Sequence, residues 1–156
     1  MLKVAIIGAG AISTAHIEGY LQFRDRCQIV AVSDVYPEKA LARIEQFGIE
    51  ARAVQDYKEL LEGGIDIVSV CTPPYTHADI AVDFLNAGSH VIIEKPMASS
   101  LKECDEINEA ASRNGKLVSV IAQNRFRNPM MKLKTVLESG LAGATGLSVV
   151  VSSITA

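Results

Sequence analysis

The segment Val91–Met97, with the sequence VIIEKPM, places a lysine directly after an apolar run and directly before a proline. Proline has no backbone N–H and disfavours the helical region for the preceding residue, so we expect Lys95 at the carboxyl end of a strand. In an open parallel sheet that end faces the ligand crevice, where an amine can move protons. The segment is equally consistent with a surface lysine before a turn, and the other motifs must decide between the two.

The start of the chain predicts a binding loop for a dinucleotide. An apolar run over residues 2–7 is typical of a buried strand, and the sequence GAGAIS over residues 8–13 leads from it into a predicted helix over residues 11–22. Gly8 would permit the tight turn, and Gly10 would let the backbone approach a pyrophosphate. The start of the helix would present free N–H groups to that anion. The cofactor-binding residues predicted here are Gly8, Gly10, Ala11 and Ile12.

This loop departs from the dinucleotide fingerprint at its third small residue, which is Ser13 instead of glycine or alanine. That position serves the packing of the helix on the strand, so a small serine should cost little. Many turns between a strand and a helix are glycine-rich for purely steric reasons. The loop therefore needs support from elsewhere in the chain.

Asp34 supplies that support, because it follows a second apolar run over residues 28–33. An acidic residue at the tip of the second strand can accept hydrogen bonds from the ribose hydroxyls of adenosine, and its charge repels a 2′-phosphate. This favours NAD over NADP as the cofactor. An alternative is that Asp34 caps the helix that begins near Pro37.

Composition limits the classes of function. A chain of 156 residues with 49% hydrophobic and 21% charged residues fits one ordinary globular domain. Its net charge of −3 gives no electrostatic footprint for nucleic acid, and no apolar stretch is long enough to span a bilayer. The cysteines are odd in number and widely spaced, as in reduced cytosolic proteins, which predicts a cytoplasmic location. The three histidines, His16, His77 and His90, lack a metal-ligand spacing, so we expect no metal site.

Strand-like and helix-like segments alternate along the chain. The predicted strands cover residues 2–7, 28–33, 50–54, 65–70, 90–94 and 116–122, and the predicted helices cover residues 11–22, 37–47, 56–62, 76–87 and 100–114. Asp56 is expected to cap its helix, and capping boxes are expected at Thr76 with Asp79 and at Ser100 with Glu103. Strands joined by helical crossovers call for an α/β fold with a doubly wound parallel sheet, which we assign to a dinucleotide-binding Rossmann domain over residues 1–122.

Several motifs together resemble one protein family over essentially the whole sequence. The matching segments are GAGAISTAH over residues 8–16, Ser33-Asp34, CTPPYTH over residues 71–77, Glu94-Lys-Pro96, Asn124-Arg-Phe126 and LESGLAG over residues 137–143. In order and spacing, these segments resemble the family of glucose–fructose oxidoreductase and inositol dehydrogenase. The resemblance implies NAD(P)-dependent oxidoreduction of a sugar, a polyol or a related carbinol.

The resemblance also implies roles for individual residues. Lys95 would be the catalytic lysine, and Arg125 would lie near the rim of the active site, although a solvated arginine in a loop explains Arg125 equally well. The family often has asparagine where this chain has Pro74. His77 would line the cofactor cleft; the alternative is a solvated histidine at a helix start. The further cofactor-binding residues implied by the resemblance are Cys71, Thr72, Pro73, His77, Glu94, Lys95, Asn124 and Arg125.

The mechanism that we expect is hydride transfer between a substrate carbinol and C4 of nicotinamide. The hydroxyl proton must leave as well, and Lys95 would remove or relay it. Partial burial and the positive nicotinamide ring would favour the neutral amine that this role needs. Alternation along the strand would send the side chain of Glu94 to the opposite face. His16, in the first helix, is expected to pack or to hydrogen-bond locally.

Residues 123–156 are expected to begin a second α+β domain, with a connecting helix over residues 129–139 and a first strand over residues 147–154. A lone strand leaves unpaired backbone groups, so we expect the chain to be the cofactor-binding part of a longer enzyme that forms a homo-oligomer. Two alternatives remain. One is a non-catalytic NAD-binding sensor or scaffold, and the other is a methyltransferase, whose chemistry gives no place to Glu94-Lys-Pro96.

Overall fold

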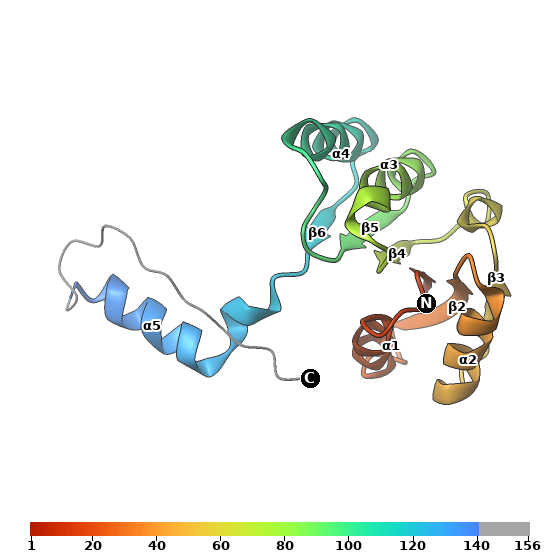
Figure 1. Cartoon of the computed structure of the whole chain (residues 1–156), viewed down its shortest axis with the longest axis horizontal. Coiled ribbons are helices and arrows are strands. Elements are labelled where there is room, and N and C mark those ends of the chain that lie inside the picture. Colours follow the sequence, from red (N-terminus) through yellow and green to blue (C-terminus); the bar gives the residue numbers. More distant parts are fainter. Residues whose placement is uncertain (141–156) are drawn as a thin grey trace. The chain divides into compact units, whose positions relative to one another are not determined.

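The structure is a computed structural model that describes residues 1–140, and Figure 1 shows its elements. The chain divides into two compact units, the first covering Met1–Ile121 and the second beginning at Ala122. The strand predicted over residues 147–154 lies outside the described residues. None of the described helices is long and apolar enough to cross a membrane.

Within residues 1–140, six parallel strands form one sheet in the order β3-β2-β1-β4-β5-β6. The strands are β1 (Leu2–Ile7), β2 (Cys27–Ser33), β3 (Arg52–Val54), β4 (Ile67–Val70), β5 (His90–Ile93) and β6 (Val118–Val120). The chain builds outward from β1 to β3 and then returns to place β4 on the other side of β1. This reversal is the topological switch point of a doubly wound sheet, and it confirms the predicted fold class.

Helices cover both faces of this sheet. They are α1 (Ser13–Leu21), α2 (Pro37–Phe47), α3 (His77–Asn86) and α4 (Leu101–Asn114). In β1, Val4 and Ile6 belong to a core cluster with Ile17 of α1 and Ala40 of α2. Ala5 and Ile7 belong to the cluster of α3 and α4 on the opposite face. Successive side chains of a strand point to opposite faces, so a continuous apolar run such as β1 is required to fill both cores.

Helix starts follow the sequence signals unevenly. Asp56 caps the 3-10 helix Tyr57–Leu60 as expected, since its Oδ1 accepts a hydrogen bond from the Lys58 N–H at 2.9 Å. Ser100 caps α4 by accepting from the Glu103 N–H at 3.2 Å. In return, the Glu103 carboxylate accepts from the N–H of Ser99, so the predicted capping box closes one residue earlier than expected.

The predicted capping box at Thr76 and Asp79 is wrong. A 3-10 turn, Pro74–Thr76, precedes α3, and no side-chain bond caps the helix at Thr76. The hydroxyl of Thr76 lies 2.8 Å from both the Thr72 Oγ1 and the Pro73 carbonyl oxygen. A backward hydrogen bond to this loop therefore replaces the forward bond to the helix, which is the local competition typical of threonine.

The second unit contains a 3-10 helix, Gln123–Phe126, and the helix α5 (Asn128–Glu138), which was predicted over residues 129–139. Pro129 lies in the first turn of α5, where its missing N–H leaves no intrahelical bond unmade. Asn124 and Arg125 are exposed residues of this unit. Their predicted contacts with a cofactor remain predictions.

At Gly8 the fold requires a residue without a side chain. Its φ is +95°, and a Cβ atom would lie 2.7 Å from the Cys71 carbonyl oxygen.

We expect Gly8→Ala to lower the free energy of unfolding by on the order of 2–4 kcal/mol, because backbone strain and the clash add. Urea denaturation measures the change. Gly10→Ala is the matched control, since a Cβ there meets open space and should leave stability almost unaltered; equal stability of both variants would contradict the argument.

Candidate functional site

A cleft of about 700 Å³ opens at the carboxyl ends of β1, β2 and β4, beside the switch point. Eight of the residues predicted to bind a cofactor line it together: Gly8, Gly10, Ala11, Ile12, Asp34, Cys71, Thr72 and Pro73. They come from three loops that are distant in sequence. The parallel arrangement brings these loops to one edge of the sheet, because it aligns the ends of all three strands.

The glycine loop leaves its backbone donors accessible. Gly8 donates its N–H to Ser33 O, and the Ser13 N–H and hydroxyl both donate to Gly10 O, at 3.2 and 2.6 Å. Ser13 is completely buried, which confirms that this position serves packing. Among the described residues, the N–H groups of Ala11 and Ile12 donate to no protein atom, and both residues are exposed. Free N–H groups before a helix are suited to an anion.

Asp34 joins the tip of β2 to the glycine loop. Its Oδ2 accepts from the Ala9 N–H at 2.8 Å, and its Oδ1 accepts from the Tyr36 N–H at 3.0 Å. The alternative of a cap for α2 is therefore wrong, because Tyr36 precedes the helix and no side chain caps it. A carboxylate oxygen carries more than one lone pair, so Asp34 can still accept from ribose hydroxyls.

His77 does not face the cleft, which corrects the prediction for this residue. Its side chain is completely buried, and its ring nitrogens lie 2.9 Å from Pro96 O and 2.8 Å from Thr72 O. Both nitrogens are occupied, so none is left for a cofactor. His77 instead ties the loop after β4 to the loop after β5, a role that needs two loops distant in sequence to come together.

Glu94 is also buried, and it does not line the cleft. The residue is 6% exposed, its Oε1 lies 3.2 Å from His16 Nε2, and its Oε2 accepts from the backbone N–H of Lys95. Glu94 is not among the residues that line the cleft, and its predicted cofactor contact stays a prediction. The hydrogen bond of His16 is not the local one that was expected, because its partner is 78 residues away in the sequence. Both residues of the pair Glu94 and Lys95 lie beyond the end of β5, so strand alternation does not apply to them; Glu94 is buried, Lys95 is exposed, and the Glu94 carboxylate contacts the Lys95 backbone.

Lys95 follows β5, one strand beyond the cleft, and its peptide bond to Pro96 is cis. It is exposed and does not line the 700 Å³ cleft. Within the described residues, the partial burial that the expected mechanism invokes for Lys95 is absent. Because β5 lies beside β4, the lysine is still on the same edge of the sheet as the cleft.

Sequence reasoning missed several residues that line the cleft. They are Val35, Tyr36, Lys39, Gln55, Tyr57, Tyr75, Asp79 and Ile80. Lys39 Nζ lies 4.4 Å from the centroid of the Tyr36 ring, within the range of a cation–π contact. The available signal was positional, since most of these residues directly follow a predicted strand or lie near the start of the next predicted helix. Tyr75 lies in the loop between the two.

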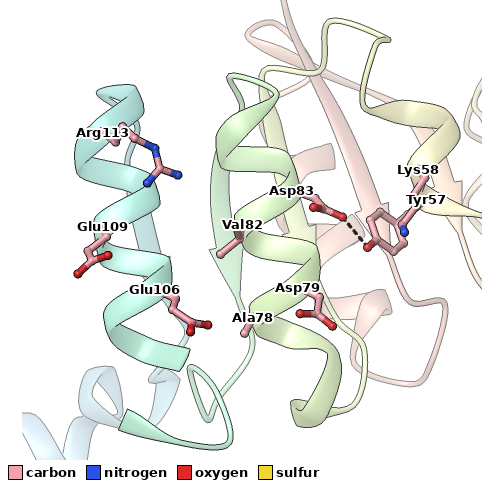
Figure 2. Close-up of a pocket in the computed structure, with 9 residues that line it drawn as sticks. All are labelled: Tyr57, Lys58, Ala78, Asp79, Val82, Asp83, Glu106, Glu109 and Arg113. Carbon is pink, nitrogen blue, oxygen red and sulfur yellow. Dashed lines mark hydrogen bonds between the residues drawn. The ribbon is translucent and has the colours of Figure 1, made fainter. Parts of the chain in front are cut away.

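A second hollow, of about 450 Å³, lies between the 3-10 helix Tyr57–Leu60 and the helices α3 and α4 (Figure 2). Four carboxylates line it, those of Asp79, Asp83, Glu106 and Glu109. The Tyr57 hydroxyl donates to Asp83 at 2.8 Å, and burial together with this hydrogen bond raises the pKa of Tyr57. Two cations, Lys58 and Arg113, also line the hollow, so its carboxylates outnumber its cations by two. This excess of negative charge disfavours a phosphate-bearing ligand, and the larger cleft is the candidate site.

The family model described as "Oxidoreductase family, NAD-binding Rossmann fold" matches residues 2–122. The chain belongs to this family. The matched range covers all the described strands and every residue of the cleft. The family therefore accounts for the glycine loop, the acidic residue after β2 and the switch point as parts of one dinucleotide-binding fold.

Proteins of similar sequence align with nearly all of the chain. Inositol 2-dehydrogenase of Salmonella typhimurium is 32% identical over 144 residues, which are 91% of this chain and 43% of that protein. A 1-carboxy-3-chloro-3,4-dihydroxycyclohexa-1,5-diene dehydrogenase of Comamonas testosteroni is 34% identical over 91% of this chain and 36% of its own length. The chain thus spans less than half the length of these relatives.

Solved structures are similar to this chain over the same part of their length. The WlbA dehydrogenase of Bordetella pertussis, in complex with NADH and UDP-GlcNAcA, superposes with a TM-score of 0.83 and 29% identity. It covers 91% of this chain, which in turn spans 43% of that protein. An oxidoreductase of Agrobacterium radiobacter in complex with NAD+, L-tartaric acid and magnesium has a TM-score of 0.81 and 28% identity.

The cleft contains a thiol whose reactivity should be low. Burial, and secondarily the charge of Glu94, raises the pKa of Cys71 from 9.0 to about 12. We expect iodoacetamide to modify native Cys71 at least about tenfold more slowly at pH 8 than Cys71 of the urea-unfolded chain, because only the thiolate reacts. Mass spectrometry of the peptides measures both rates.

The pH dependence of the modification rate tests whether the pKa of Cys71 is raised. The rate for the unfolded chain should level off above about pH 9, whereas the rate for native Cys71 should still rise toward pH 12. Cys104, which is half-buried, serves as an internal reference for access. A native rate that levels off near pH 9 would contradict the raised pKa.

Proposed function

We propose that the cleft binds NAD, and that the enzyme containing this chain transfers a hydride between nicotinamide and a carbinol of a sugar, a polyol or a related compound. The observation that carries the proposal is the bond between Asp34 and the Ala9 N–H. It joins a group suited to ribose hydroxyls to a loop suited to a pyrophosphate, so one cofactor can contact both. The dehydrogenase relatives and the NADH-bound structure of similar fold support the same conclusion.

The order of the strands favours one direction for the cofactor. Asp34 follows β2 on one side of the glycine loop, and Lys95 follows β5 on the other side. Adenosine would therefore lie toward Asp34, the pyrophosphate at Gly10 and Ala11, and the nicotinamide toward β4 and β5. When bound, NAD would supply the ring carbon that accepts a hydride.

Lys95 would handle the proton of the substrate hydroxyl in this arrangement. Lys95 is exposed at the edge of the sheet where the cleft opens, so its amine can reach a substrate that is bound next to the cleft. Glu94 and His77 would position it, because Glu94 holds the backbone N–H of Lys95 and His77 holds the carbonyl of Pro96. These bonds fix the backbone on both sides of the lysine while leaving its side chain free.

The whole enzyme has further proposed properties. Its relatives are more than twice as long as the matched part, so we propose that substrate contacts come partly from a second domain that begins near residue 123 and also supports a homo-oligomer. The three cysteines of the sequence are free, in accord with the proposed cytoplasmic location. The second candidate function is a non-catalytic NAD-binding sensor, favoured by the position of Lys95 outside the cleft.

Asp34 should decide between NAD and NADP. We expect the chain to bind NADH at least about tenfold more tightly than NADPH, because the carboxylate repels a 2′-phosphate. Asp34→Asn should narrow this ratio, mainly through tighter binding of NADPH. Enhancement of cofactor fluorescence on binding measures both affinities. Asp56→Asn is the matched control, since Asp56 also accepts a backbone N–H but lies outside the cleft; an unchanged ratio in Asp34→Asn would refute the role of Asp34.

Lys95 should be needed for turnover and not for cofactor binding. In the complete protein encoded by the gene, Lys95→Ala should bind NADH within about threefold of wild type and lose turnover of polyols by about 10²- to 10⁴-fold. Lys95→Arg should also be inactive, because arginine keeps its proton. Lys102→Ala, at an exposed lysine of α4, is the control. Full turnover in Lys95→Ala would eliminate the proposed role, and the absence of polyol turnover in wild type would favour the sensor.

A further inference from the structure

Two cations lie one helical turn apart on the side of α2 that faces the site. Lys39 lines the 700 Å³ cleft, and Arg43 Nη2 lies 3.4 Å from Gly10 O in the glycine loop, where it can donate a hydrogen bond. Residues four apart share one face of a helix, so their charges lie close together. Like charges at this spacing destabilise a helix. Lys39 has the Tyr36 ring as a partner, and an anion beside the pair would relieve the remaining repulsion.

The described residues provide no carboxylate for that purpose. No carboxylate among them lies within 4.0 Å of either cation, and the Arg43 guanidinium contacts only neutral groups, Gln46 Oε1 at 2.8 Å and Gly10 O. The Arg43 Nε is buried without a hydrogen-bond partner. Elsewhere on its helices the chain pairs a lysine with a glutamate four residues later, as in Lys102 with Glu106. An arginine that is partly buried and not neutralised costs free energy.

The contact with Gly10 has a geometric consequence. A trans peptide is planar, so the C=O of Gly10 and the N–H of Ala11 point in opposite directions. The donors of Arg43 and Ser13 hold the Gly10 carbonyl from one side. They thereby aim the Ala11 N–H away from themselves, and Ala11 lines the cleft. A hydrogen bond to the carbonyl also polarises the peptide and strengthens the N–H as a donor.

We infer that Arg43, with Lys39, forms the electrostatic part of the dinucleotide site. Arg43 is a positioning residue that fixes the Gly10–Ala11 peptide from behind and adds positive charge next to the diphosphate. The diphosphate in turn supplies the negative charge that the pair lacks in the protein. This inference rests on the proposed binding of NAD and adds a residue outside the glycine loop that determines affinity for the anionic part of the cofactor.

The test compares ligands with and without a diphosphate on the 156-residue chain. Arg43→Gln should weaken binding of NADH and of ADP-ribose by about fivefold or more at low salt, and leave the competition by adenosine within about twofold of wild type. Arg43→Lys, which retains the charge, should stay within about threefold. The loss in Arg43→Gln should shrink as salt is raised to 0.5 M, because salt screens the charge.

Controls separate this role from a structural one. Arg24→Gln removes the same charge from an exposed site just before β2, at the opposite edge of the sheet, and should leave all three affinities unchanged. The thermal midpoint of Arg43→Gln should not fall, since the change removes a repulsion within α2. Unaltered NADH affinity in Arg43→Gln, or an equal loss for adenosine and ADP-ribose, would overturn the inference. Failure of wild type to bind NADH would instead overturn the proposed function itself, and the inference with it.

Discussion

The close approach of Gly8 to Cys71 is the contact on which the site depends. At this point the loop after β1 and the loop after β4 leave the sheet in opposite directions, and a Cβ on Gly8 would lie 2.7 Å from the Cys71 carbonyl oxygen. The contact sets how near the two loops come before they separate. Because they diverge from such a narrow point, the space between them widens into the cleft.

Polar contacts around the cleft hold loops together and leave selected groups free. Asp34 links β2 to the glycine loop, and His77 links the loops after β4 and β5 from a fully buried position. Each link uses a side chain to satisfy backbone atoms of a distant loop, which buried polar groups require. The N–H groups of Ala11 and Ile12 are left without partners in the described chain. Hydrogen bonds thus join the loops of the site to one another, while the N–H groups of Ala11 and Ile12 remain available to a ligand.

The sequence predicted more of the fold than of the site. Apolar runs broken by glycine and proline locate the strands to within a few residues, and Ser100 and Asp56 mark helix starts, because these signals act over one turn. Thr76 shows the limit of such signals, since its hydroxyl bonds to the preceding loop. At the site, the glycine loop and Asp34 were predictable because each directly follows an apolar run.

By itself, the sequence determined the parallel doubly wound sheet and the residues that its strand ends carry, since alternating buried strands and helices allow few other arrangements. Only the tertiary structure decided which of those residues face the cleft. It turned His77 and Glu94 inward, where Pro96, Thr72 and His16 meet them, and it brought Arg43 to the glycine loop. The reason is that a side chain's partner in such contacts lies on another segment of the chain, so no local pattern of residues can specify it.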